Sequence, residues 1–120
     1  MTERNLYQLH ADICHTLANP KRLEIIDTLR TREMSVTELA DALEISQSNL
    51  SQHLALMRQR GILTSRREGL NVFYSLSNPK ITQACDLMRQ ILIEHLEAGA
   101  ELAREESIKK KTYHDRKQNG

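Results

Sequence analysis

Apolar residues recur at intervals of three and four along most of this chain, which is the spacing that places them on one side of an α-helix. The first stripe predicts a helix over about Leu6–Leu17, and Asn19-Pro20 then predicts the cap and first position of a second helix. Asn78-Pro79 repeats this device before a long stripe that predicts a last helix over about Lys80–Ser107. The chain is therefore expected to be mainly helical.

Between these elements, the segment from Ser35 to Arg60 predicts two short helices joined by a tight turn, which is the pattern of a helix-turn-helix. Ser35, with Glu38 three residues later, predicts a capping box at the start of the first helix, and Ser46 predicts the cap of the second. The apolar positions of the second helix, which we expect to pack inward, are Leu50, Leu54 and Met57.

The opposite face of that second helix is short, neutral and rich in hydrogen-bonding groups. Amide and hydroxyl groups can both donate to and accept from base edges, and small side chains let a helix approach the floor of the major groove. The alternative is a helix face that is only solvated. We predict that this helix reads DNA through Gln47, Ser48, Asn49, Ser51, Gln52 and His53.

The residues after Gly61 predict a β-hairpin, with strands over Ile62–Arg67 and Leu70–Leu76 and a turn at Glu68-Gly69. A hairpin that directly follows a recognition helix is called a wing. The sequence therefore predicts a winged helix-turn-helix.

Positive charge gathers in this part of the chain. Between residues 47 and 67 there are four arginines and no acidic residue, although the formal net charge of the whole chain is only +1. Local positive charge is expected where a protein meets phosphates. We therefore predict that Arg66 and Arg67 contact phosphate or the minor groove; the alternative is that they only keep an edge strand soluble.

Length and composition fit one small domain with a core of Leu, Ile and Ala, since the 120 residues include 3% aromatics and no Trp. The last apolar stripe is longer than such a domain can cover, which predicts a homodimer packed through the first and last helices. We expect a DNA-binding and dimerisation domain over residues 1–107 and a basic, flexible tail over residues 108–120. No apolar run has membrane length and no leader is recognisable, so we expect a cytoplasmic protein without a membrane partner.

The sequence contains no nucleophile elbow, phosphate loop or His-Glu-x-x-His motif, so we predict that the protein is not an enzyme and has no catalytic residues. A helix-turn-helix used only for protein association is the remaining class. Its surface would favour exposed Leu, Tyr or Trp anchors, whereas Ser48, Ser51 and Gln52 are weak anchors. DNA binding is the better interpretation.

Three motifs together resemble the ArsR/SmtB family of winged-helix repressors, over about residues 9–92. Residues 17–23 (LANPKRL) are similar to the opening signature of that family, residues 46–54 (SQSNLSQHL) to its recognition helix, and residues 67–69 with 72–74 to its wing. The resemblance implies four helices, a hairpin and a fifth helix, assembled as a homodimer. It also implies a repressor that binds an inverted-repeat operator in double-stranded DNA and leaves it when a small inducer is sensed.

The metal sites of the best-known sensors in this family are absent. Where arsenic and cadmium sensors have Cys-x-Cys, this chain has Ser35-Val36-Thr37, whose hydroxyls are poor ligands for soft ions. The zinc-type site needs an Asp-x-His pair, but Asp86 is followed by Met88 in the place of the histidine. We predict no metal-binding residues and no cofactor. The alternative is a metal or metalloid ion bound by His10 and Cys14 of the first helix, together with Cys85 or His95 of the last helix.

The two cysteines suggest thiol chemistry as the sensing mechanism. Cys14 lies on the first predicted helix and Cys85 on the last, and these helices are expected to pack together across the dimer. A disulfide or polysulfide bridge between them would shift the last helix and respace the DNA-reading helices. Two alternatives remain: the cysteines are small core hydrophobes, or the protein is a regulator that senses nothing.

Overall fold

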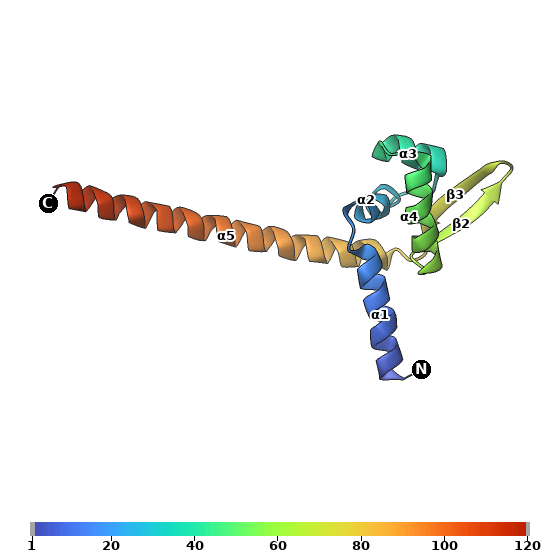
Figure 1. The fold of residues 1–120 in the computed structure, drawn as a ribbon, viewed down its shortest axis with the longest axis horizontal. Coiled ribbons are helices and arrows are strands. Elements are labelled where there is room, and N and C mark those ends of the chain that lie inside the picture. Colours follow the sequence, from blue (N-terminus) through green and yellow to red (C-terminus); the bar gives the residue numbers. More distant parts are fainter. Residues whose placement is uncertain (1, 120) are drawn as a thin grey trace. The chain divides into compact units, whose positions relative to one another are not determined.

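The computed structural model describes the backbone of residues 2–119 and the side chains of residues 2–109. The described residues form five helices and three short strands. Figure 1 labels all of them except the two-residue strand β1. Their bounds are α1 Glu3–Leu17, α2 Pro20–Thr28, β1 Met34–Ser35, α3 Val36–Leu43, α4 Gln47–Gln59, β2 Leu63–Glu68, β3 Asn71–Leu76 and α5 Lys80–Asn119. The chain divides into two compact units, residues 1–85 and residues 86–120.

Side-chain caps start the helices where the sequence predicted them. The Asn19 carboxamide oxygen accepts from the backbone N–H groups of Lys21 and Arg22, ahead of Pro20 at the first position of α2. Ser35 and Glu38 form the predicted capping box at the start of α3. These contacts satisfy backbone donors that a helix start leaves without partners.

The helix-turn-helix is completed by a second cap and a left-handed turn. Ser46 caps α4 by accepting from the Asn49 N–H at 3.2 Å. Glu44, between α3 and α4, adopts a left-handed conformation with φ of 54°. The cap joins residues only three positions apart, and the left-handed conformation involves a single residue. This is why the sequence alone predicts the turn.

The three strands form an antiparallel sheet in the order β1-β3-β2. β2 and β3 pair from Leu63 with Leu76 to Glu68 with Asn71, so the hairpin turn consists of Gly69 and Leu70. The predicted turn at Glu68-Gly69 is one residue too early, because Glu68 pairs within the ladder and Gly69 supplies the positive φ of 62°. The strand β1 was not predicted, since two residues are too few to show an alternating pattern.

The core lies among α2, α3, α4 and the start of β2. Its most completely buried members on α4 are Leu50, Leu54 and Met57, which confirms the inward face predicted for that helix. Ile25 and Ile26 of α2 are also buried, so the core is aliphatic as predicted. This packing fixes the orientation of α4 and leaves its opposite face in solvent.

α5 begins at Lys80 as predicted and runs to Asn119, beyond the predicted end at Ser107. Its apolar spacing weakens after residue 108, and residues 109–119 contain no Gly or Pro that would end a helix. The separate basic tail over residues 108–120 stays a prediction; most of its side chains lie outside the described residues. Within the described part of the chain, no helix has the length and apolarity needed to cross a membrane.

Candidate nucleic-acid interface

The outward face of α4 carries five of the six residues that were predicted to read DNA. Their side chains are exposed and polar: Gln47, Ser48, Asn49, Ser51 and Gln52. Among them only Gln47 has a described side-chain contact, a long one of 3.5 Å between its Nε2 and the Thr37 Oγ1 of α3. The face therefore keeps its amide and hydroxyl groups available to base edges.

His53, the sixth residue predicted on α4, is half-buried and faces the α1–α2 junction instead. The Arg22 Nε donates to His53 Nδ1 at 3.2 Å, and the Arg22 Nη1 donates to the Thr16 carbonyl at 3.1 Å. Burial lowers the pKa of His53, and the positive charges of Arg22 and Lys21 lower it further. A neutral ring that accepts at Nδ1 carries its proton on Nε2. His53 thus joins α4 to α2, and any DNA contact by its Nε2 remains a prediction.

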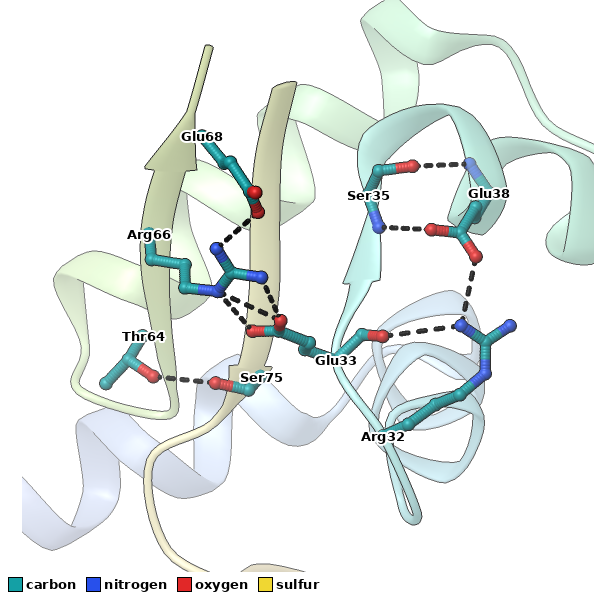
Figure 2. Close-up of polar contacts among 8 residues, drawn as sticks. All are labelled: Arg32, Glu33, Ser35, Glu38, Thr64, Arg66, Glu68 and Ser75. Atoms are coloured by element: carbon teal, nitrogen blue, oxygen red, sulfur yellow. Dashed lines mark hydrogen bonds and ion pairs between the residues drawn. The ribbon is translucent and has the colours of Figure 1, made fainter. Parts of the chain in front are cut away.

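The two predicted wing arginines have different surroundings. Arg67 is exposed, and no polar partner accompanies it among the side chains that the structure describes. Arg66 instead donates from Nε to both carboxylate oxygens of Glu33, at 2.9 and 3.0 Å, and from Nη2 to the same carboxylate. Its Nη1 donates to Glu68 at 2.8 Å (Figure 2).

The surroundings of Arg66 stabilise its charge within the protein. Hydrogen bonds to Glu33 and Glu68 raise the pKa of Arg66, and the same contact with Arg66 lowers the pKa of Glu33. The guanidinium also lies 4.7 Å from the centre of the Phe73 ring. The Arg67 guanidinium is therefore more available to a phosphate than the Arg66 guanidinium is.

Neither Arg22 nor Glu33 stands out in the sequence: Arg22 is one position of the motif over residues 17–23, and Glu33 belongs to no motif. Their partners lie 31 and 33 positions away, so no local spacing indicates either contact. The fold brings these pairs together.

The structure places the two predicted sensing cysteines in different environments. Cys14 on α1 is exposed, whereas Cys85 on α5 is half-buried and packs against the core. Both are thiols in this structure. No group of three or more His, Cys, Asp or Glu side chains suited to a metal ion occurs among the described residues of one chain. His10, Cys14, Cys85 and His95 thus form no such cluster there.

A helix-turn-helix with a polar recognition face, followed directly by a hairpin, defines a winged-helix DNA-binding domain. A sequence model described as "Bacterial regulatory protein, arsR family" matches residues 19–65. The transcriptional activator HlyU of Vibrio cholerae is 43% identical over 75 residues, which are 62% of this chain and 69% of HlyU. The transcriptional repressor PagR of Bacillus anthracis is 37% identical over 82 residues, which are 68% of this chain and 82% of PagR.

Solved structures show the same architecture. The solution structure of the homodimeric winged helix-turn-helix DNA-binding domain Mb0332 from Mycobacterium bovis aligns with a TM-score of 0.72 and 28% identity, covering 81% of this chain and 92% of that one. The chain belongs to the arsR family of bacterial regulatory proteins. It is a transcription regulator and not an enzyme, as the sequence predicted.

Proposed function

We propose that this protein is a homodimeric repressor that binds an inverted-repeat operator through α4 and leaves it when an inducer is sensed. The observation that carries the proposal is the two-sided character of α4, which buries Leu50, Leu54 and Met57 and exposes short amide and hydroxyl side chains. PagR is named a repressor and HlyU an activator, so repression rests on part of the family only. We expect the protein to act in the cytoplasm, where its DNA target lies.

In this proposal α4 enters the major groove and the wing lies along the neighbouring backbone. Gln52 is central on the exposed face, and a glutamine can pair with adenine through two hydrogen bonds. Arg67 neutralises a phosphate. Two α4 helices related by a twofold axis would read half-sites one helical turn, roughly 10 bp, or a multiple apart.

The proposed dimer uses apolar side chains that a single chain leaves in solvent. On α1, Leu9 and Ile13 are half-exposed and line a cavity of about 300 Å³ together with Gln59 and the Asp12–Arg60 ion pair. On α5 the large exposed apolar side chains among the described residues are Leu87, Met88, Ile91, Leu92, Ile93, Leu96, Leu102 and Ile108. A second copy of the chain would cover these surfaces, as the homodimeric Mb0332 domain suggests.

DNA reading is tested by selecting operator duplexes from a random pool and measuring affinity by fluorescence anisotropy. Gln52→Ala should lose roughly 1–3 kcal/mol of discrimination at one base pair of each half-site, because its two hydrogen bonds to that base are removed. Gln83→Ala, the same change at an exposed position of α5, is the matched control and should retain the preference. If Gln52→Ala binds as tightly and as selectively as the parent, Gln52 does not read the operator.

For the inducer we propose oxidation of Cys14 and Cys85 by a polysulfide or another thiol oxidant, with a sulfur bridge between protomers as product. When a disulfide bridge forms, two thiols lose two electrons and two protons, and the polysulfide that takes them up is reduced to hydrogen sulfide and a polysulfide one sulfur shorter. The exposure of Cys14 supports access for such a reagent, and the position of Cys85 against the core supports coupling to the DNA-binding unit. A metal ion at His10, Cys14 and Cys85 is the competing inducer.

The two proposed inducers are distinguished by measuring how much operator DNA the protein releases when zinc, arsenite, peroxide or polysulfide is added. Cys14→Ser and Cys85→Ser should each keep operator affinity and lose the response to polysulfide, and mass spectrometry should find a peptide that links the two positions. His10→Ala is the matched control and should respond normally. Release by zinc or arsenite that is lost in His10→Ala would favour the metal, and an unchanged response in the double serine variant would exclude both cysteines as sensors.

A further inference from the structure

Arg66 bridges the whole width of the small sheet. It lies on the edge strand β2, opposite Phe73 of the central strand β3, and its guanidinium lies over the Phe73 ring. The same guanidinium reaches Glu33, the residue before the other edge strand β1 (Figure 2). Glu33 and Glu68 then accept from all three nitrogen atoms of the guanidinium. We call Glu33, Arg66 and Glu68 the wing clamp.

The wing clamp sits where the sheet narrows from three strands to two. β1 pairs only through Met34 with Tyr74 and through Ser35 with Phe73. Beyond Phe73 the hairpin residues 67–72 pair only with each other or form the turn. A two-stranded hairpin is marginally stable in water, so the contact between Arg66 and Glu33 is the last fixed point before the wing tip.

The wing clamp also leads directly into the helix-turn-helix. Ser35, two residues after Glu33, is the N-cap of α3, and its capping partner Glu38 accepts from the Arg32 Nη1 at 3.0 Å. Arg32 and Glu33 therefore hold opposite sides of one junction, the first toward α3 and the second toward the wing (Figure 2). The position of the wing is thereby tied to the helices that carry the DNA-reading face.

The charge of the wing clamp argues against a phosphate contact by Arg66. Its one guanidinium faces two carboxylates, so the group as a whole carries a net negative charge. Bidentate pairing with a carboxylate is the same geometry that an arginine uses for a phosphate, and Glu33 already occupies it. To bind DNA, Arg66 would have to leave both acids.

We propose that Arg66 is a positioning residue, which holds the wing at a fixed angle to the helix-turn-helix, and that the phosphate contact of the wing is made by Arg67. This inference rests on the proposed function in one respect, namely that the wing touches DNA. The pair is half-exposed and contributes little to global stability, so variants of it should remain folded.

Glu33→Gln distinguishes the two possible roles of Arg66, because they predict different changes in operator affinity. If Arg66 positions the wing, operator binding should weaken roughly two- to fivefold even though one negative charge is lost, which is the effect of an exposed ion pair. If Arg66 contacts phosphate, removing its competing acid should leave binding equal or tighter. Asp41→Asn, the same charge change on the exposed side of α3, is the control and should bind as well as the parent or slightly better.

The salt dependence of binding gives a second readout, which counts phosphate contacts and does not depend on the absolute affinity of a variant. The double variant Glu33→Gln/Arg66→Gln leaves the net charge of the protein unchanged. If the two residues only position the wing, this variant should keep the parent slope of log affinity against log salt. If Arg66 contacts a phosphate, the slope should become shallower by about one unit. Arg67→Gln should show that shallower slope. A parent slope in Arg67→Gln together with a shallower slope in the double variant would overturn the proposal.

Amide hydrogen exchange of the protein without DNA tests the wing clamp independently of DNA binding. Glu33→Gln should speed exchange in residues 67–72 and leave α4 unchanged, while Asp41→Asn should change neither. Unchanged exchange in residues 67–72 would refute the positioning role. If the parent itself selected no operator, the proposed function would fail while this measurement still reported on the wing clamp.

Discussion

At the scale of single residues, His53 and Arg66 each have a charged partner on a distant part of the chain: Arg22 donates to His53, and Arg66 donates to Glu33. The exposed residues Ser48, Ser51 and Gln52 could be predicted because helical spacing alone decides which side of α4 is buried. The surroundings of His53 and Arg66 could not, because they depend on Arg22 and Glu33, which only the tertiary fold brings near. The exposure of the short polar side chains of α4 was thus predictable from sequence, but the half-burial of His53 and the contacts of Arg66 within the protein were not.

At this scale His53 should make stability depend on pH. Burial and the charges of Arg22 and Lys21 lower the pKa of His53 in the folded state, so the folded protein binds a proton less readily than the unfolded chain. The contribution of His53 to the free energy of unfolding is complete above the pKa of an ordinary histidine, about 6.5. It falls as the pH drops from there toward the lower pKa of the folded state, by about 1.4 kcal/mol for each unit by which the two pKa values differ.

The measurement compares urea denaturation of the parent and His53→Gln at pH 7.5 and pH 5.5. Glutamine does not titrate and can still accept from the Arg22 Nε, so the variant should lose less stability between the two values than the parent. Ser48→Ala, a change at an exposed position of α4 that carries no titratable group, is the control and should lose as much as the parent. Equal losses in the parent and His53→Gln would mean that His53 does not titrate differently on folding.

At the scale of elements, the contacts that start helices are local and were therefore predictable. Asn19, Ser35 and Ser46 each bind backbone N–H groups two or three residues ahead, so a short motif contains both partners. The elements that were missed or misplaced depend on distant partners: β1 exists only because β3 pairs with it, and the hairpin register shifts the turn to Gly69-Leu70. The end of α5 was placed too early, at Ser107, because no Gly or Pro lies between that residue and Asn119 to mark where the helix ends.

One cap can be tested directly, because Ser46 sets the start of the recognition helix. Ser46→Ala removes the acceptor for the Asn49 N–H and should lower the free energy of unfolding by about 1 kcal/mol, whereas Ser46→Asp, which keeps an acceptor, should cost much less. Denaturation in urea measures both. Ser51→Ala, an exposed change within the same helix, is the control, and a loss there as large as that of Ser46→Ala would mean that capping is not the cause.

At the scale of the whole molecule, the pattern of the sequence predicted more apolar surface than one copy of the domain can bury. The structure places that surface on two helices, since Leu9 and Ile13 of α1 and Met88 and Ile91 of α5 are all at least 40% exposed. The fold of each unit follows from the residues within it. A partner surface does not, because the residues that would cover these side chains belong to another copy, and only their exposure indicates it.

The dimer is tested by placing a charge on α5 where the interface is proposed. Ile91 is 58% exposed in the single chain, so Ile91→Glu should leave each protomer folded; in a dimer it would bury an unpaired carboxylate from both copies. A buried unpaired charge costs about 3–5 kcal/mol. This cost should raise the dissociation constant of the dimer roughly a hundredfold or more. Sedimentation should then show monomers, and operator affinity should fall because two half-sites are no longer bound by one molecule. Gln83→Glu adds the same charge at an exposed polar position of α5 and should stay dimeric. A dimeric Ile91→Glu protein with parental affinity would place the interface away from this part of α5.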